Sequence, residues 1–490
     1  MSVTDAADAP LGADTVYLNG INALTGEYLV PPTPVAEIAN LVKSQPDDPQ
    51  TRVLSRMGEM ASQVTLGLPP DRDPKDLKQA GWAIVFHASE KQEIKEAFRP
   101  LIEHRQAEIG DERLVKVLDY RNGEGRAQWL ARFRVAAGDV DPLKVPYYLL
   151  FVGSPAQIPF TFGFLLDVEY AVGHVAFETV EECATYANNI VDYERKKSSV
   201  KNGREVLFFA TRHPLDGATR LSADQLVLPL ADGLPSGAIA PQSTPAKYGF
   251  RSRKIWGKDA TKAALVAALC AKNTTPPAVL FSASHGMAGW PAGDPAQLAS
   301  QGALLCQDWP GLGKIGPDHY FAASDLPGDA QVHGLIAFLF ACYSIGTPQY
   351  DRYFHRRSTP PPVIASSPFY AQLPQKLLTH KNGGALACVG HVERAWGCSI
   401  VSTGAVPQLG PFQNALGFIM QGVPLGHAIQ DFNQKFAILS ADLTALLEDI
   451  GFGAKVSDTD LATRWLERND AEGYAIFGDP AVRLRLEDLV

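Results

Sequence analysis

Two segments of the sequence end in side chains that could act together as a nucleophile and its base. The apolar run 278–283 leads into His285 and Gly286, and a second apolar run from Leu335 leads into Cys342. Runs of this length and composition are typical of buried parallel strands. Because ligands bind outside the carboxyl ends of such strands, a His and a Cys on two of these ends can meet as base and nucleophile. The pattern predicts a cysteine hydrolase.

Each of these residues also has a purely structural interpretation. A Cys after Phe-Leu-Phe-Ala is often a small buried hydrophobe, and a single His is often an ordinary hydrogen-bonded residue. Gly286, however, lets the backbone approach a substrate carbonyl, and Ser344 and Gly346 indicate a turn directly after Cys342. Taken together, the residues favour catalysis over packing.

The wider sequence resembles the caspase, gingipain and CHAT-domain cysteine peptidases, which carry His-Gly on one strand and Ala-Cys on a later one. The segments YYLLFVGSPAQIPF, LLDVEYAVGHVAFET and YANNIVDYE resemble the non-catalytic first half of a gingipain-type catalytic domain. They are followed in the family's order by HGMAGW, ACYSIGTPQYD, GGALACVGHVERAW and YAIFGDPAVRLRL. The resemblance runs from about Leu77 to Leu486 and leaves out the first seventy or so residues. The caspase motif Q-A-C-[RQG]-G is absent, so cleavage after Asp is not expected.

The resemblance implies a Cys-His dyad. Cys342 would attack as the thiolate, and His285 would exchange protons with the nucleophile and the leaving amine. The backbone N–H groups of Gly286 and Cys342 would stabilise the oxyanion, each contributing about 3 kcal/mol. No third catalytic residue is evident from spacing, and Ser284 or a backbone carbonyl could orient the imidazole.

Three further residues are implied to bind the substrate. Asp167 matches the gingipain aspartate that receives a basic side chain, which predicts cleavage after Arg or Lys. Trp396 matches the aromatic lid of that pocket, and Glu393 would add negative charge at its rim. The alternatives are that Asp167 caps an apolar run, that Trp396 belongs to the core, and that Glu393 has no role.

The order of apolar and helical segments predicts an α/β fold: a caspase-like, three-layer α/β/α arrangement with a mostly parallel sheet and two gingipain-like subdomains. A chain of 490 residues is too long for one ordinary domain. We expect an N-terminal extension or prosegment at 1–75, a non-catalytic subdomain at 76–200 and a catalytic subdomain at 201–490. Strands are predicted at 80–87, 113–120, 147–153, 205–211, 278–284, 335–341 and 384–390. Helices are predicted at 35–44, 90–108, 125–138, 180–197, 259–271 and 369–380.

Composition narrows the class of partner. The net charge is −9 with acidic and basic residues interspersed, so nucleic acid is not expected as a partner. The N-terminus lacks the features of a signal peptide, and no apolar stretch is long enough to cross a membrane. The six cysteines are sparse, which suits reduced thiols. Together these features predict a cytoplasmic protein. Cys388, His391 and Cys398 lack a fourth ligand at a zinc-type spacing, so neither a metal nor a cofactor is expected. The expected partners are a protein or peptide substrate and a regulatory protein.

Two segments outside the motifs could control access to the site. Residues 290–330 between His285 and Cys342 look like an inserted loop, and long loops are often functional lids. We expect this insertion or the N-terminal extension to gate the cleft. The alternatives to an endopeptidase are a regulatory or scaffold protein with a gated or silent site, and a different thiol hydrolase such as a peptide ligase or amidase.

Overall fold

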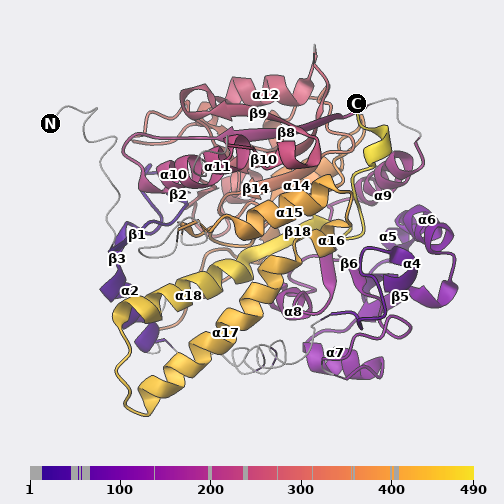
Figure 1. Ribbon diagram of the computed structural model, residues 1–490, viewed down its shortest axis with the longest axis horizontal. Coiled ribbons are helices and arrows are strands. Elements are labelled where there is room, and N and C mark those ends of the chain that lie inside the picture. Colours follow the sequence, from indigo (N-terminus) through magenta and orange to yellow (C-terminus); the bar gives the residue numbers. More distant parts are fainter. Residues whose placement is uncertain are drawn as a thin grey trace.

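One ten-stranded sheet forms the centre of the protein (Figure 1). The computed structural model describes residues 14–45, 53, 57 and 67–490, except 137, 197–200, 235–240, 273, 312, 355, 357–358, 398–399 and 402–407. Across the sheet the strands follow the order β5-β4-β6-β7-β18-β17-β14-β10-β8-β9. Their bounds are β4 (Trp82–His87), β5 (Val115–Tyr120), β6 (Tyr148–Val152), β7 (Ala171–Val175), β8 (Gly203–Ala210), β9 (Arg251–Trp256), β10 (Pro277–Ala283), β14 (Ile336–Phe340), β17 (Ala387–His391) and β18 (Tyr474–Gly478).

The sheet has two halves that run in opposite directions. Strands β5, β4, β6 and β7 are mutually parallel, as are β9, β8, β10, β14 and β17. Strand β18 joins the halves because it pairs antiparallel with β17 and parallel with β7. The carboxyl ends of the two sets of strands therefore lie at opposite edges of the sheet, and only the second half presents its carboxyl ends at the edge that carries His285 and Cys342.

Burial explains the layered architecture. Every residue of β4, β6, β10, β14 and β17 is buried, which requires other elements to cover both faces of these strands. The expected α/β class with a mostly parallel sheet is what the structure has. The surrounding helices include α4 (Leu77–Ala80), α5 (Gln92–Ala97), α6 (Arg99–Ile109), α7 (Arg126–Arg132), α8 (Phe160–Leu166), α9 (Val180–Glu194), α10 (Gly217–Leu221), α11 (Leu228–Asp232), α12 (Lys262–Cys270), α14 (Gln372–Leu378), α15 (Gly410–Met420), α16 (Leu425–Ala428), α17 (Gln430–Gly451) and α18 (Asp458–Gly473).

Some expected elements differ from those observed. The single helix predicted over 90–108 is two helices, α5 and α6, which meet at Phe98 with Pro100 in the first turn of α6. Proline lacks the N–H that a continuous helix needs at this point, so the helix restarts there. Strands β7, β9 and β18 and the long pair α17 and α18 were not predicted. The subdomain boundaries at 76 and 201 stay a prediction.

The N-terminal segment packs onto the second half of the molecule. It contains β1 (Thr15–Val16), β2 (Ile21–Asn22), β3 (Thr33–Pro34) and the predicted helix α2 (Val35–Lys43). Helix α2 lies against α18 (Figure 1) and buries Ile38 and Val42 in a cluster with Trp465. Residues 14–45 of the N-terminal segment are therefore part of the folded body.

The insertion between His285 and Cys342 is ordered rather than an irregular loop. Its described part contains α13 (Pro295–Ser300) and a small antiparallel pair of β12 (Leu304–Leu305) and β13 (Tyr320–Phe321). Trp290 and Trp309 pack in a small core that also contains Ile21 of the N-terminal segment. The insertion thus packs against the N-terminal segment. Among the described residues, no helix combines the length and apolar character needed to cross a bilayer.

Candidate active site

His285 and Cys342 follow two strands that lie side by side. Strand β10 pairs in parallel with β14, with Ala283 opposite Phe340, so the next residues of both strands emerge at the same edge. A β-carbon built on Gly286 would lie 1.8 Å from the carbonyl oxygen of Cys342. Only glycine permits this contact, which holds the two backbone segments against each other. The structure therefore brings His285, Gly286 and Cys342 together, as the sequence predicted.

A third residue completes the site. Asp216 follows β8 and caps the N-terminus of α10, and its Oδ2 lies 2.5 Å from Nε2 of His285. Ala218 donates its backbone N–H to Oδ1 at 3.0 Å, and the hydroxyl of Thr219 donates to Oδ2 at 2.9 Å. The Tyr28 hydroxyl also donates to this carboxylate. Asp216 is held in one orientation by these contacts.

Electrostatics keep Asp216 ionised. Burial by itself would raise the pKa of Asp216, but the electrostatic interaction with the His285 ring and the hydrogen bonds from His285 and Tyr28 hold that pKa well below its usual range. An ionised carboxylate only accepts hydrogen bonds, so Nε2 of His285 carries the proton and Nδ1 is left with a lone pair. Asp216 thereby sets the tautomer in which Nδ1 can act as a base.

Sequence reasoning missed Asp216 and left the role open, with Ser284 or a backbone carbonyl as possible partners of the imidazole. The Ser284 hydroxyl instead donates to the backbone oxygen of its neighbour His285 at 3.1 Å, so it does not orient the ring. The available signal was the Asp-Gly-Ala-Thr sequence after the apolar run of β8, because Asp is a preferred helix cap and β8 ends at the same edge as β10.

The Cys342 thiol is fully enclosed. Its side chain has 0% exposure, and the backbone N–H of Ala395 points at Sγ from 3.2 Å. Burial raises the pKa of Cys342 to about 12, so the sulfur is a neutral thiol at neutral pH in this state. Tyr343 follows with a φ of 58° and begins the turn that was expected after the nucleophile.

The N-terminal segment covers the site. The backbone N–H of Gly20 donates to Nδ1 of His285 at 2.8 Å. A β-carbon built on Gly20 would lie 3.2 Å from Sγ of Cys342 and 3.0 Å from Cδ1 of Leu29. Gly20 therefore touches both reactive side chains and separates them from solvent.

The three residues expected to bind substrate have different surroundings. Asp167 ends α8, and its Oδ1 accepts a hydrogen bond from the backbone N–H of Val172. Burial raises the pKa of Asp167 well above its usual range, and β7, which follows it, is separated from β14 by β18 and β17. A neutral carboxyl in this place fits the capping interpretation and gives no support to the predicted anchor for a basic side chain.

Trp396 and Glu393 lie close to the nucleophile. Trp396 forms an isolated antiparallel bridge with Leu18, while its ring is fully buried against Trp465 with centroids 5.5 Å apart. Its backbone meets the covering segment and its ring belongs to the core. Glu393 is buried rather than exposed at the rim of a pocket, and its carboxyl group contacts the guanidinium of Arg394. Its backbone oxygen accepts a hydrogen bond from the N–H of Tyr343. Burial raises the pKa of Glu393 to about 8.

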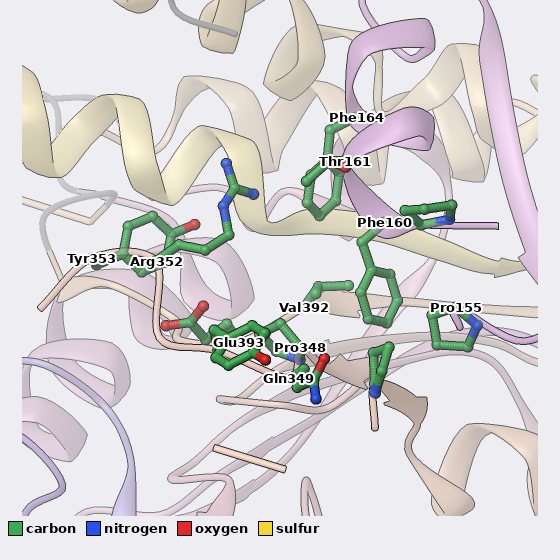
Figure 2. A pocket seen from close by; sticks show the side chains of 13 residues that line it. Pro155, Phe160, Thr161, Phe164, Pro348, Gln349, Arg352, Tyr353, Val392 and Glu393 are labelled. Atoms are coloured by element: carbon green, nitrogen blue, oxygen red, sulfur yellow. The ribbon is translucent and has the colours of Figure 1, made fainter. Parts of the chain in front are cut away.

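A pocket of about 250 Å³ adjoins Glu393 (Figure 2). Phe160 and Phe164 of α8 line one side, and Pro348 and Tyr353 from the segment after the Cys342 turn line the other. The lining is mainly apolar, with Glu393 and Arg352 as its ionisable members. Such a pocket suits a side chain that is mostly apolar and carries one polar group.

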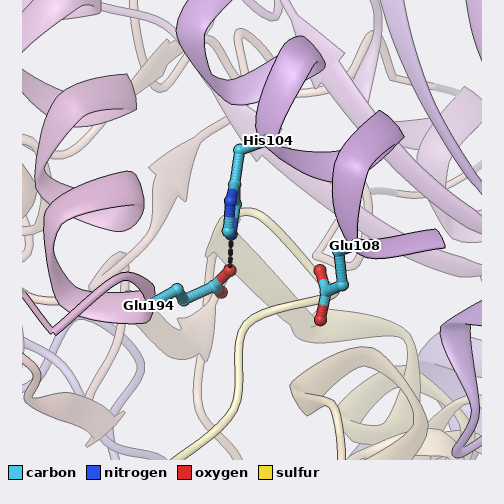
Figure 3. Close-up of side chains that lie close together, drawn as sticks. All are labelled: His104, Glu108 and Glu194. Carbon is cyan, nitrogen blue, oxygen red and sulfur yellow. Dashed lines mark hydrogen bonds and ion pairs between the residues drawn. The ribbon is translucent and has the colours of Figure 1, made fainter. Parts of the chain in front are cut away.

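A cluster of His104, Glu108 and Glu194 has the composition of a metal site (Figure 3). The positive charge that a metal ion would supply comes from Arg105, because its guanidinium lies 2.6 Å from Glu108 and 2.7 Å from Glu194. The same guanidinium lies 2.7 Å from Asp479. These contacts fit an ion-pair network that joins α6, α9 and the segment after β18. Cys398, part of the other metal candidate of the sequence, lies outside the described residues, and Cys388 is buried in β17.

Comparison with known proteins gives structural relatives without a sequence family. No protein-family model and no curated protein sequence matches the chain. Among solved structures, a chain described as "Structure of Protease" aligns with a TM-score of 0.44 at 12% identity, covering 83% of this chain and 78% of that one. The complex of the pro- and mature domains of RgpB from Porphyromonas gingivalis aligns with a TM-score of 0.41 at 12% identity, covering 83% and 80%. The chain is thus structurally similar to a protease and to this gingipain.

Proposed function

We propose that the protein is a cysteine endopeptidase in which Cys342, His285 and Asp216 form a catalytic triad. The observation that carries the proposal is the position of Gly20. Its backbone amide donates to Nδ1 of His285 while its α-carbon faces the sulfur of Cys342, so a peptide already fits between nucleophile and base. A site that accommodates a main chain in this way suits hydrolysis of peptide bonds.

The residues have separate roles in the proposed reaction. Nδ1 of His285 takes the proton of Cys342, and the thiolate attacks the carbonyl carbon of the substrate. Asp216 stabilises the imidazolium and keeps Nε2 protonated, and Nδ1 then protonates the leaving amine. Water hydrolyses the resulting thioester. The backbone N–H groups of Gly286 and Cys342 are the proposed donors to the oxyanion.

The test uses a variant whose cleft is open. Gly20→Glu cannot seat its side chain between Cys342 and Leu29, and a φ of 111° at this position disfavours any side chain. We expect this variant to hydrolyse fluorogenic peptides and Gly20→Glu with Cys342→Ala to be inactive. Gly20→Glu with Cys388→Ala is the matched control, because Cys388 is an equally buried cysteine in the adjacent strand β17 and should be dispensable for hydrolysis.

The same assay decides between the candidate specificities and the alternative function. Peptides with Arg, Lys, Asn or Asp before the scissile bond test the expected preference for a basic residue. The full burial of Cys342 also suits a regulatory or scaffold protein with a gated or silent site. Hydrolysis that does not depend on Cys342, or none by the open variant, would favour that second function over a peptidase.

A further inference from the structure

The turn after Cys342 and the loop after β17 hold each other in strained conformations. Tyr343 has a φ of 58° and Glu393 a φ of 72°, both in the left-handed region that side chains disfavour. The N–H of Tyr343 donates to the backbone oxygen of Glu393, and the N–H of Glu393 donates to the oxygen of Gly346 at 3.0 Å. Bulky residues keep such conformations only where their surroundings hold them. The loop 392–396 is therefore fixed relative to the nucleophile.

This arrangement aims a hydrogen-bond donor at the nucleophilic sulfur. The N–H of Ala395 lies 3.2 Å from Sγ of Cys342. Burial has the largest influence on the pKa of Cys342 and raises it, whereas the Ala395 N–H and the charge of Arg394 lower it. A donor and a positive charge both favour the ionised form of a thiol, because they interact more strongly with the thiolate.

Arg394 is held by Asp351, which belongs to the segment after the nucleophile. The guanidinium lies 2.8 Å from Oδ2 of Asp351, and it lies over the ring of Phe354 at 5.1 Å from the centroid. Oδ1 of Asp351 accepts the backbone N–H groups of Tyr353 and Phe354, each at 2.9 Å. The carboxylate is thus fixed by its own segment, and its ion pair fastens the loop 392–396 to that segment.

Glu393 can offset the charge of Arg394. Its carboxyl group contacts the guanidinium, but burial raises the pKa of Glu393 to about 8, so the carboxyl is mostly protonated at neutral pH. The titratable and charged groups that face it are Arg394 beside it, Asp351, Arg352 and Tyr353 after the nucleophile, and Glu472 of α18. When Glu393 ionises in alkaline solution, its charge opposes the negative charge on the sulfur of Cys342.

We propose that Arg394 and Asp351 are positioning residues that hold the Ala395 N–H against the sulfur of Cys342, so that this amide and the guanidinium stabilise the thiolate. This inference rests on the proposed role of Cys342 as the nucleophile. The pair acts on the proton equilibrium between the thiol and Nδ1 of His285. An ion pair that served stability alone would leave that equilibrium unchanged.

The experiment measures alkylation of Cys342 by iodoacetamide as a function of pH in the open Gly20→Glu variant, with the modified peptide quantified by mass spectrometry. Asp351→Asn with Arg394→Met removes both charges and leaves neither partner as an unpaired buried charge. We expect the ionisation midpoint of Cys342 to rise by about one pH unit, which lowers the alkylation rate at neutral pH about tenfold. Glu393→Gln should shift the midpoint the other way, because no carboxylate then opposes the thiolate.

The matched control is Arg126→Met with Glu169→Gln in the same Gly20→Glu background. This pair is also buried, and it joins α7 to the segment before β7. It should leave the midpoint of Cys342 unchanged, and thermal unfolding checks that each variant is folded.

The outcomes separate this inference from the proposed function. No rise after Asp351→Asn with Arg394→Met, or an equal rise in the control, overturns the inference, and peptide hydrolysis by Gly20→Glu would still support the peptidase. A midpoint that rises in Glu393→Gln also overturns the inference, whether or not the doubly changed protein folds. The expected shifts without any Cys342-dependent hydrolysis would support the positioning of the thiolate and remove the proposed function.

Discussion

At the residue scale, Tyr28 ties the N-terminal segment, which covers the candidate site, to Asp216 of the proposed triad. The Tyr28 hydroxyl donates to the carboxylate of Asp216, which in turn contacts His285. Removing the first seventy residues, which is the obvious way to open the cleft, would therefore also remove a contact of the triad.

Asp216→Asn should abolish most of the peptide hydrolysis of the open Gly20→Glu variant while the fold is retained. The amide can donate to Nε2 and so favours the wrong tautomer of His285, which should lower kcat on the order of 10⁴-fold. The measurement is steady-state kinetics together with thermal unfolding. Asp224→Asn is the control, because Asp224 follows α10 and pairs with Arg212 instead of His285. An Asp216→Asn protein with near-normal kcat would contradict the triad.

At the element scale, the cluster around Arg105 joins helices α6 and α9 to the segment that follows β18. Arg105 on α6 contacts Glu194 at the end of α9 and Asp479 directly after β18, and its side chain is fully buried. Arg483 extends the network by pairing with Glu108 at 3.0 Å. A buried guanidinium needs such partners, because breaking one contact leaves a charge without compensation.

Glu194→Gln should lower the free energy of unfolding by about 3 kcal/mol at pH 7. Burial opposes ionisation of Glu194, but Arg105 and His104 outweigh it and lower its pKa from 4.5 to about 2. A carboxylate with a depressed pKa contributes stability that is complete above its unfolded pKa and is lost as the pH falls toward 2. The wild type should therefore lose stability between pH 4.5 and 2 more steeply than Glu194→Gln, as measured by urea unfolding.

The control for this prediction is Glu96→Gln, which removes an exposed pair with Arg99. Exposed pairs contribute at most about 1 kcal/mol, so this change should be small. Equal acid sensitivity of Glu194→Gln and the wild type would show that Glu194 does not carry the effect.

At the scale of the whole molecule, the N-terminal segment that covers the candidate site is anchored away from that site, through helix α2. Helix α2 lies on α18 at the margin of the molecule (Figure 1). The chain between β1 and α2 passes His285 and Cys342 at Gly20. The insertion after His285 supplies the opposite wall through Trp290 and Trp309. The two segments that were considered as gates therefore meet at the candidate site. The N-terminal segment lies in the site, and the insertion packs against that segment.

Ile38→Ala should weaken the packing of the N-terminal segment over the candidate site, while the strands that carry His285 and Cys342 stay folded. Ile38 is 1% exposed and packs with Trp465, and removal of a buried Ile side chain costs about 2–5 kcal/mol of local packing. We expect faster hydrogen exchange in α2 and faster alkylation of Cys342 at neutral pH, both measured by mass spectrometry. Ile94→Ala on α5 is the control, because α5 packs in the first half, and it should leave both rates unchanged.

How far the sequence predicts this protein can be judged from particular elements. Strands such as β10 and β14 were predictable because a strand buried on both faces needs an unbroken apolar run, and the chemistry at their ends followed from His285 and Cys342. Strand β18 was not predicted as a strand, and its position between β7 and β17 depends on pairing with distant segments. The long helices α17 and α18 were missed, although the buried residues Phe432, Phe436, Leu439 and Leu443 of α17 follow the helical spacing of three or four residues.

The sequence by itself determined the α/β class and singled out His285 and Cys342 as the candidate pair, because apolar periodicity and residue chemistry are local properties. Only the tertiary structure decided that Asp216 orients His285, that Asp167 is a buried cap, and that Gly20 lies against Cys342. These facts join residues far apart in the chain: the amide of Gly20 and the ring of His285 are 265 positions apart. Spacing in the sequence carries no record of such contacts, since they arise when the sheet is assembled and the N-terminal segment is laid across its edge.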